Sequence, residues 1–112
     1  MCIFCKIVAR EIDANVVFQD DRVTAFRDVN PQAPVHILIV PNEHISSVVD
    51  LQPDQLPLLG HMTHTATLLA DKEGVTGSGF RLVLNAGPDA GQSVDHLHLH
   101  LLAGRSLKWP PG

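Results

Sequence analysis

The sequence has few cysteines, few basic side chains and no long apolar segment. Its two cysteines are too few for a disulfide scaffold. Eight lysines and arginines face twelve acidic residues, which gives a net charge of −4. This argues against a nucleic-acid partner, because proteins that bind nucleic acids normally present a basic face. No apolar run approaches the roughly 20 residues that cross a bilayer. We therefore expect a soluble cytoplasmic protein that binds neither nucleic acid nor a membrane.

The composition is that of a folded protein with a packed core. Apolar residues make up 45% of the chain and charged residues 18%, which excludes a disordered polypeptide. A length of 112 residues suits one compact domain and leaves little room for two. We therefore expect a single domain over residues 1–112. Seven of these residues are histidines, and their placement carries most of the information about function.

Apolar patterning along the chain predicts an antiparallel sheet of about five strands. The first two strands form a hairpin across the turn at Asp20-Asp21. The third is a dense run of β-branched residues and leucine that ends at Pro41. A short helical turn at residues 3–10 precedes them. The predicted strands cover residues 16–19, 23–28, 35–40, 80–85 and 93–103.

One main helix is predicted over residues 54–72. Its apolar side chains recur at three- and four-residue steps, and Gly74 supplies a cap at its C-terminal end. Together with the sheet, this helix gives an α+β fold. His61 and His64 lie on the helix, where we expect them at the surface. The apolar positions are Leu56, Leu59, Met62, Ala66 and Leu69.

The most informative segment alternates histidine with leucine. His96, His98 and His100 fall at every second position, so on a strand they share one face at spacings of about 6.5–7 Å. The intervening leucines then point into the core. Three interpretations fit this pattern. The histidines form an ordinary polar face, they bind one metal ion as a three-nitrogen site, or they perform imidazole chemistry on a phosphate. The third is favoured, because parallel side chains on one strand converge poorly on a single ion.

Several segments resemble the histidine triad family of nucleotide hydrolases and transferases. Residues 96–102, His-Leu-His-Leu-His-Leu-Leu, match the alternating signature of that family. Residues 26–41 are similar to its second conserved block, and residues 85–94 to the loop before its triad. The ending Trp-Pro-Pro-Gly at residues 109–112 is similar to the Hint branch of the family. The resemblance covers almost the whole chain in the right order.

The resemblance implies a catalytic role for four histidines. The middle histidine of the triad, here His98, attacks the α-phosphorus and forms a nucleotidyl-histidine intermediate. The backbone carbonyl of His96 can fix the tautomer that this chemistry needs. His100 and His36 would lie near the phosphate oxygens or support the attacking ring. For His36 the alternative is a hydrogen-bonded core residue, because it lies in an apolar strand.

The resemblance also implies the residues that bind substrate. Asn85 and Ser93 would contact the phosphate or leaving group, with Ser93 a proton donor to a departing amine. Gly91 and Gln92 belong to a loop whose backbone can approach a phosphate closely. Asp28 corresponds to the family residue that accepts hydrogen bonds from the ribose hydroxyls. The alternative for both Ser93 and Asp28 is an ordinary turn residue.

The two cysteines have the spacing of zinc ligands. Cys2-x-x-Cys5 lacks a second such pair, so histidines would have to complete a site. The family resemblance points to His44 and His96 as the other two ligands of a structural zinc that the chemistry does not need. The alternatives are two thiols without a metal, or a redox pair, which the absence of a βαβ pattern argues against.

The activity implied is cleavage at the α-phosphorus of nucleoside 5′-phosphoramidates or acyl-adenylate-like compounds. The nucleotide released would be AMP or GMP, since the Hint resemblance favours purines. The alternatives are a dinucleoside polyphosphate hydrolase and a nucleotide-binding scaffold or regulatory protein with weak turnover. The resemblance further implies a homodimer with a sheet continued across both copies. In that dimer, Trp109 would reach the site of the partner and contact its substrate.

Overall fold

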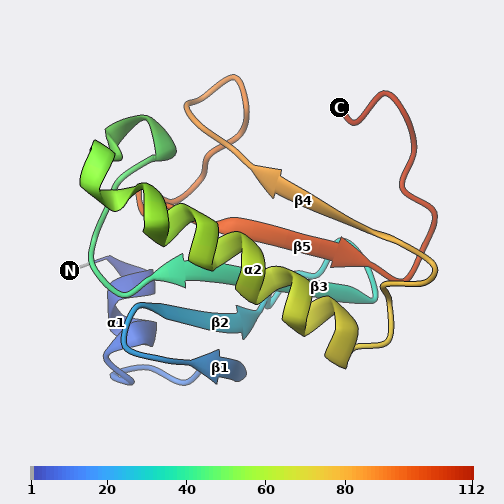
Figure 1. Cartoon of the computed structure of the whole chain (residues 1–112), viewed down its shortest axis with the longest axis horizontal. Helices are drawn as coiled ribbons and strands as arrows, with labels where there is room; N and C mark the ends of the chain where they lie inside the picture. Colours follow the sequence, from blue (N-terminus) through green and yellow to red (C-terminus); the bar gives the residue numbers. More distant parts are fainter. Residues whose placement is uncertain (1) are drawn as a thin grey trace.

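The computed structural model describes residues 2–112 and contains one five-stranded antiparallel sheet in the order β1-β2-β3-β5-β4. The predicted α+β fold is confirmed, with one long helix lying across the sheet (Figure 1). No helix among these residues is long and apolar enough to span a membrane. The elements are α1 (Ile3–Val8), β1 (Val16–Gln19), β2 (Val23–Arg27), β3 (Val35–Pro41), two 3-10 turns (Val48–Asp50 and Pro53–Gln55), α2 (Leu56–Lys72), β4 (Phe80–Leu84) and β5 (Leu99–Ala103).

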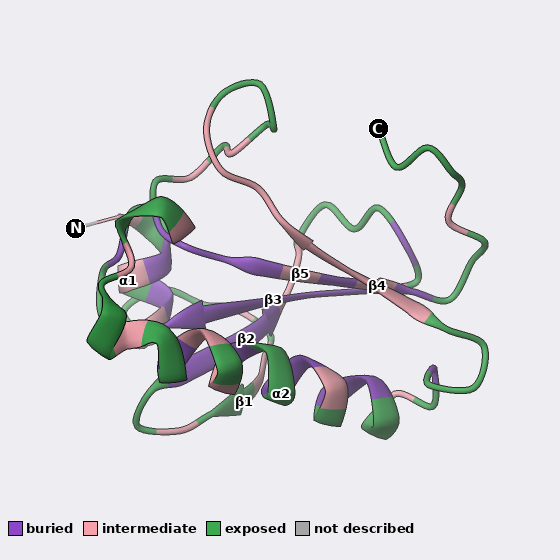
Figure 2. Ribbon diagram, turned by 45° about the horizontal axis from the view of Figure 1, so that its top comes forward, coloured by how far each residue is buried: buried purple, intermediate pink, exposed green. Residues whose placement is uncertain are grey.

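The central strand β3 separates two hydrophobic cores, because its side chains alternate between the faces of the sheet. Ile37 and Ile39 pack in the larger core, beneath α2. Leu38 and Val40 face the other way and pack in a smaller core that includes Phe4 from α1. Figure 2 shows β3 and β5 buried along most of their length. The two helices therefore lie on opposite faces of the sheet, and α1 shares its face with the histidines.

The buried stripe of α2 differs in part from the prediction. Met62, Ala66 and Leu69 are buried as expected, but Leu58 begins the stripe and Leu56 is 57% exposed. Leu56 precedes Met62 by six residues, which at about 100° per residue places it roughly 120° away from the stripe.

The C-terminal end of α2 is capped as predicted. Gly74 adopts a φ of +73°, which is unstrained only for glycine. The N–H of Val75 donates to the carbonyl of Ala70, and the N–H of Gly74 donates to that of Asp71. These two bonds form a Schellman motif and satisfy carbonyls that the helix leaves unpaired.

The last strand is shorter than predicted. Residues 93–103 were expected to form one strand, but β5 begins at Leu99, which pairs with Ile39 of β3. Continuing this register places Leu97 opposite Pro41, and proline has no N–H to donate to that partner. The N–H of Leu97 instead donates to the carbonyl of Ile45 at 2.6 Å. The side-chain alternation nevertheless persists, since Leu97 is buried in the α2 core.

The two histidines of α2 differ in environment. His64 is exposed as expected, whereas His61 is half-buried and its Nε2 lies 2.7 Å from Oδ2 of Asp20. Burial raises the pKa of the Asp20 carboxyl, but hydrogen bonds from the Val23 and Arg22 N–H groups and from His61 outweigh this effect. The pKa of Asp20 is therefore lowered, and its carboxylate joins α2 to the β1–β2 turn.

Candidate active site and metal cluster

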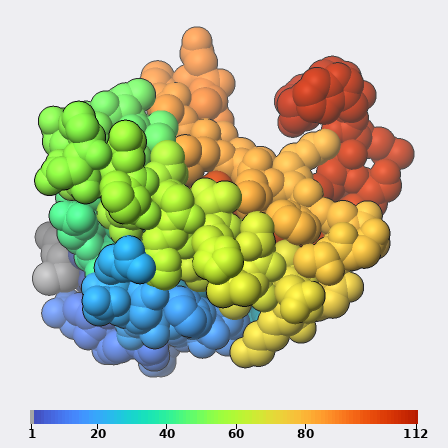
Figure 3. Space-filling model, in the orientation of Figure 1, coloured from blue at the N-terminus to red at the C-terminus, as the bar shows by residue number. Residues whose placement is uncertain are grey.

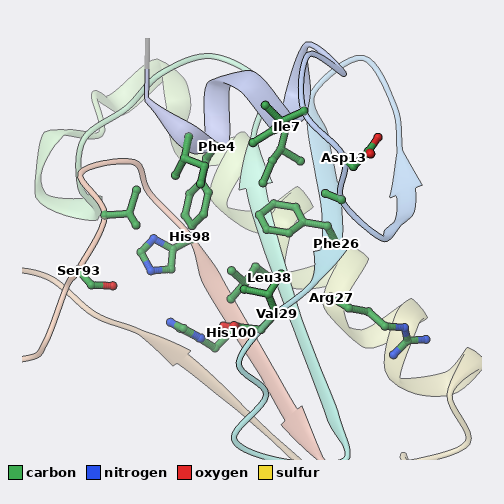
Figure 4. Close-up of a pocket in the computed structure, with 15 residues that line it drawn as sticks. Phe4, Ile7, Asp13, Phe26, Arg27, Val29, Leu38, Ser93, His98 and His100 are labelled. Atoms are coloured by element: carbon green, nitrogen blue, oxygen red, sulfur yellow. The ribbon is translucent and has the colours of Figure 1, made fainter.

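A cavity of about 290 Å³ lies between α1 and the histidine face of the sheet. One part of its wall is apolar and the other carries polar side chains (Figure 4). The polar part brings together four of the predicted site residues from separate parts of the chain. Those residues are Asp28, Ser93, His98 and His100, and the apolar part includes Ile3, Phe4, Ile7, Phe26, Leu38 and Val94.

The tautomer of His98 is fixed by the backbone. Its Nδ1 lies 2.7 Å from the carbonyl oxygen of His96, and a carbonyl can only accept a hydrogen bond, so Nδ1 carries the hydrogen. The predicted bond to His96 is therefore confirmed. Nε2 keeps its lone pair, and the ring borders the cavity. The rings of Phe4 and His100 pack against this imidazole at centroid distances of 5.2 and 5.0 Å, which restricts its rotation.

A second chain of hydrogen bonds fixes His36 and His100. The backbone N–H of Gln32 donates to Nδ1 of His36 at 3.0 Å, so the hydrogen of this imidazole lies on Nε2. Nε2 of His36 donates to Nδ1 of His100 at 2.9 Å. The hydrogen of His100 must then lie on its own Nε2. His100 is thereby prepared to donate a hydrogen bond to an anion in the cavity.

The pKa values agree with these neutral tautomers. Burial, together with repulsion from His98 and His36, lowers the pKa of His100 to about 4, against the attraction of Asp28. Burial also lowers the pKa of His36, with Asp28 again acting in the opposite direction. Both rings are therefore neutral at pH 7. Neutrality is required here, because a protonated imidazole has no nitrogen that can accept a hydrogen bond.

Asp28 acts as a turn residue and also lines the cavity. Its Oδ1 accepts a hydrogen bond from the N–H of Asn30 at 2.9 Å, as a turn residue does. Its Oδ2 lies 3.5 Å from Nε2 of His36, and the residue lines the cavity. One oxygen therefore holds the turn after β2, and the other is available to a ligand.

Only some of the other predicted substrate-binding residues line the cavity. Ser93 lines the cavity, whereas Asn85 and Gly91 do not. Trp109 is 83% exposed. It belongs to the C-terminal tail, which projects away from the body of the protein (Figure 3). Within a single copy, the structure therefore does not bring Trp109 to the histidines.

The predicted zinc ligands form a compact cluster. The donor atoms of Cys2, Cys5, His44 and His96 all lie within 4.8 Å of one another. The two sulfurs are 3.3 Å apart. The sulfur–nitrogen distances are 3.3 and 3.6 Å to His96 and 3.6 and 3.4 Å to His44. Tetrahedral zinc with ordinary bond lengths separates a sulfur from a nitrogen ligand by about 3.5 Å and two sulfurs by about 3.8 Å. The sulfur–nitrogen distances are therefore close to those that this ion requires, whereas the two sulfurs would have to move apart.

The hydrogen bond of His96 supports the same conclusion. Its Nε2 lies 2.9 Å from the carbonyl oxygen of Pro41 and must donate to it. Nδ1 then has a free lone pair directed at the two sulfurs, as in metal-bound histidines whose other nitrogen is held by a carbonyl. Burial raises the pKa of the Cys5 thiol, and the neighbouring Cys2 raises it further. Without an ion the Cys5 thiol therefore stays protonated, and a bound cation would stabilise its thiolate.

The three triad histidines do not converge on one metal ion. Among residues 2–112, His96 belongs to the cysteine cluster, and His100 belongs to a separate group with Asp28 and His36. His98 belongs to neither group. The interpretation of the alternating histidines as a three-nitrogen metal site therefore finds no support in the geometry.

Comparison with known proteins agrees with this geometry. A family model described as "Scavenger mRNA decapping enzyme C-term binding" matches residues 1–108. The chain is 50% identical over 105 residues to a purine nucleoside phosphoramidase of Escherichia coli strain K12, covering 94% of this chain and 88% of that protein. It is 46% identical over 112 residues to a 14 kDa zinc-binding protein of Brassica juncea, covering 98% of each.

A solved structure also matches this chain over its whole length. The crystal structure of a HIT family hydrolase from Legionella pneumophila Philadelphia 1 superposes with a TM-score of 0.98 at 49% identity and covers 100% of both chains. The chain belongs to the histidine triad family. It is a hydrolase of this family. The resemblance of its sequence to the Hint branch is confirmed by 46% identity over 112 residues to the adenylylsulfatase HINT1 of Arabidopsis thaliana, which covers 98% of this chain and 76% of that protein.

Gln92 of this histidine triad hydrolase holds the loop before the triad. Its Oε1 accepts a hydrogen bond from the N–H of Gly87 at 3.2 Å. Its Nε2 donates to the carbonyls of Ser46 and Val94 at 2.7 and 3.1 Å. Gln92 was expected to bind substrate as part of a loop whose backbone approaches a phosphate, and its side chain is hydrogen-bonded within the protein. Its observed contacts orient the loop that carries Ser93.

Sequence reasoning missed three groups that shape the site of this triad protein. The N–H of Gln32 and the carbonyl of Pro41 fix histidine tautomers, and no sequence signal identifies them because nearly every residue carries such backbone groups. Phe4 packs on both His96 and His98. Its position between the two cysteines, within one helical turn, was a signal that could have found it.

Proposed function

We propose that this histidine triad hydrolase cleaves nucleoside 5′-phosphoramidates through a covalent nucleotidyl intermediate on His98. The observation that carries the proposal is the backbone bond from Nδ1 of His98 to His96. This bond leaves Nε2 as a neutral nucleophile beside the cavity, next to His100 and Ser93. A relative at 50% identity is named a purine nucleoside phosphoramidase, which supports the same substrate class.

In the first step, the lone pair on Nε2 of His98 attacks the α-phosphorus and forms a nitrogen–phosphorus bond. The bond from phosphorus to the substrate nitrogen breaks, and its electron pair leaves with the amine. The amine takes a proton from Ser93, whose hydroxyl acts as the donor. Nδ1 of His98 keeps its hydrogen, and the positive charge that develops on the ring is stabilised by the His96 carbonyl.

In the second step, water attacks the phosphorus and the bond to His98 breaks. Nε2 recovers its lone pair, and one proton of the water returns to the Ser93 oxygen. The other stays on the new hydroxyl of the nucleoside monophosphate. The balance is one phosphoramidate and one water consumed, one amine and one nucleotide released. An acyl-adenylate-like substrate would react at the same nitrogen of His98, but its carboxylate leaves without taking a proton. Ser93 then keeps its hydrogen, and the proton that water loses in the second step goes to the solvent.

The cavity suggests how a nucleotide is held. The Nε2 hydrogen of His100 would bind a phosphate oxygen, and the chain from Gln32 through His36 would keep that hydrogen in place. The free oxygen of Asp28 would accept hydrogen bonds from the ribose hydroxyls. The apolar part of the wall, which includes Phe26 and Leu38, would cover the base. Asn85 and Gly91, in the loop before the triad, would contact the phosphate or the leaving group. The nucleotide released would be AMP or GMP.

We further propose that Cys2, Cys5, His44 and His96 hold a structural zinc. The ligand distances support this assignment, as does the relative named as a zinc-binding protein. When bound, zinc supplies a positive charge that stabilises the thiolates and ties the N-terminal helix to the triad segment. The proposed reaction uses none of its Lewis acidity.

The functional unit we propose is a homodimer. Strands β1 and β4 leave open edges on the sheet, and pairing of a sheet edge with a second copy removes such an edge. In a dimer, the exposed tail that carries Trp109 can reach the partner's cavity. Analytical ultracentrifugation tests this arrangement, and a protein that remains monomeric at micromolar concentration would contradict it.

A direct comparison of substrates tests the proposed reaction. The expected result is rapid hydrolysis of adenosine 5′-phosphoramidate, slow hydrolysis of a diadenosine polyphosphate, and loss of both with His98→Ala. Calorimetry should still detect AMP binding to that variant. Preference for the polyphosphate would instead identify a dinucleoside polyphosphate hydrolase. AMP binding without any hydrolysis would identify a nucleotide-binding scaffold.

A further inference from the structure

The short helix α1 connects the proposed zinc site, formed by Cys2, Cys5, His44 and His96, to the cavity proposed to bind the nucleotide. Cys2 caps the helix and Cys5 lies in its first turn, with Cys2 Sγ accepting a hydrogen bond from the Cys5 N–H. Phe4 and Ile7, on the buried side of the same helix, line the cavity. A displacement of the two sulfurs would therefore displace part of the cavity wall.

Phe4 is the side chain that touches both sites. Its ring packs edge-on against His98 with centroids 5.2 Å apart and planes at 80°. It also packs against His96 at 5.9 Å and against Phe26 at 5.4 Å. Figure 4 shows the Phe4 ring beside the His98 imidazole, at the wall of the cavity. Phe4 is 7% exposed, so it has little freedom to move independently of the helix.

His96 provides a second connection between the sites. Its ring nitrogen Nδ1 is one of the four donor atoms of the proposed zinc site, while its backbone carbonyl accepts the hydrogen bond from His98. The ring is also held by Pro41. One residue thus offers a ligand to the ion and the acceptor that orients the neighbouring imidazole.

The stability of α1 depends on these side-chain contacts. The helix has only six residues, and isolated helices of this length do not persist in water. Its position must therefore come from the packing of Phe4 and Ile7 and from the ligands Cys2 and Cys5. An ion that binds four ligands from α1 and two distant segments fixes this position more firmly than packing alone.

We propose that Phe4 is a positioning residue that couples metal binding in the cysteine cluster to nucleotide binding beside His98. The inference rests on the zinc site and the nucleotide cavity of the proposed function. Zinc holds α1 so that Phe4 closes one wall of the cavity, and a bound nucleotide packs against that wall and holds α1 for the ion. Each ligand then strengthens the binding of the other by the same factor, as linkage requires.

The test measures zinc affinity with and without a nucleotide, so it does not depend on turnover. The full chain is titrated against a chromophoric zinc chelator in the absence and presence of saturating AMP. The weak binding of zinc by AMP is determined separately without protein. We expect AMP to raise the zinc affinity by about fivefold or more, within the usual range of coupling between sites. Zinc should raise the AMP affinity by the same factor.

Three variants assign the coupling to Phe4. Phe4→Ala should bring the ratio of the zinc affinity with AMP to that without AMP close to one. Phe4→Leu, which keeps apolar bulk at this position, should recover much of the coupling. Ile7→Ala is the matched control, because Ile7 is buried on the same helix and lines the same cavity but places no ring against His96 or His98. It should weaken AMP binding but lower the ratio of zinc affinities with and without AMP much less than Phe4→Ala does.

The outcomes separate this inference from the proposed function. If the unaltered protein binds both ligands and its zinc affinity is the same with and without AMP, the coupling is refuted and both sites stand. If Phe4→Ala folds and keeps the full ratio, the role of Phe4 is refuted. If the unaltered protein binds no zinc or no AMP, the corresponding part of the proposed function fails, and the coupling fails with it.

Discussion

Each imidazole at the site has one nitrogen committed to a fixed partner, and this determines what the other nitrogen can do. The carbonyls of His96 and Pro41 each accept a hydrogen bond from an imidazole, and the N–H of Gln32 donates to one. Backbone groups cannot exchange donor for acceptor, so they hold a tautomer more reliably than hydroxyl side chains do. Residues of the same type are thereby suited to the different roles that we propose for them, as nucleophile, hydrogen-bond donor and metal ligand.

The lowered pKa of His100 predicts a specific dependence of stability on pH. Burial lowers this pKa to about 4 in the folded protein, against about 6.5 in an unfolded chain. Between these values the unfolded state binds more protons, so the free energy of unfolding falls as the pH drops from 6.5 to 4. His100→Asn removes this titration and should make that fall smaller. Urea unfolding at pH 7 and pH 4.5 measures the effect.

The control for this prediction is His64→Asn, at a histidine exposed on α2. It should leave the difference between the two pH values nearly unchanged. An equal loss of stability on acidification in His100→Asn and in the unaltered protein would contradict the buried, neutral state of His100.

The sequence was informative about which side chains meet at the cavity and less informative about their hydrogen-bond partners. The alternation of histidine and leucine correctly predicted opposite faces for the two sets. It also led to the correct hydrogen bond between His98 and the His96 carbonyl. The partners of His36 could not be predicted in the same way. Gln32 lies in an irregular turn whose backbone direction depends on tertiary contacts.

At the scale of elements, strand positions follow the local pattern, whereas strand ends depend on distant partners. The strands β1 to β4 agree with their predicted ranges within one residue at each end. Strand β5 begins six residues later than predicted, because Pro41 in β3 cannot pair with Leu97. No local feature of residues 93–98 reveals this, since the pairing partner lies more than 50 residues earlier in the sequence.

The phase of α2 gives a prediction with a matched pair of substitutions. Met62 is fully buried, whereas Leu56 on the same helix is 57% exposed. Met62→Ala should lower the free energy of unfolding by about 2–5 kcal/mol, through lost apolar burial and the cavity left behind. Leu56→Ala should change it by less than about 0.5 kcal/mol. Chemical denaturation measures both, and similar losses in the two variants would show that the helix has a different rotation.

The turn after β5 gives a second prediction at this scale. Gly104 has a φ of +94°, and a Cβ added there would lie 2.8 Å from the Cβ of Pro34. Gly104→Ala should therefore lower the free energy of unfolding by about 1–3 kcal/mol. Gly77→Ala serves as the control, because a Cβ there meets no atom within 4 Å. If both variants have the same stability, the close contact with Pro34 is not present in solution.

At the scale of the whole molecule, the sheet separates a face covered by α2 from a face that carries α1 and the candidate site. The core beneath α2 contains most of the buried apolar residues, while the smaller core behind α1 borders the cavity. The site is assembled from α1, the ends of β2 and β3, the loop before the triad, and β5. Patterning predicts the layers, but this assembly requires the topology. Before the structure, only the family resemblance related these segments to one another.

Removal of zinc tests whether the cluster stabilises the fold. An ion that binds only the folded state adds stability according to its free concentration, about 4 kcal/mol at 1,000 times its dissociation constant. Treatment with EDTA should therefore lower the midpoint of thermal unfolding. Cys5→Ser should unfold at a lower temperature and respond little to EDTA or to added zinc. An unaltered protein whose midpoint is the same with zinc and with EDTA would contradict a structural metal site.

The central claim is covalent catalysis by His98, and intact mass spectrometry after a rapid acid quench tests it most directly. The unaltered protein and His98→Ala are each mixed with adenosine 5′-phosphoramidate and quenched before steady state. We predict an adduct with the mass of one adenylyl group on the unaltered protein alone. Turnover in the variant should be lower by about 10⁴-fold or more. Equal turnover in both proteins, with no adduct on either, would contradict the claim.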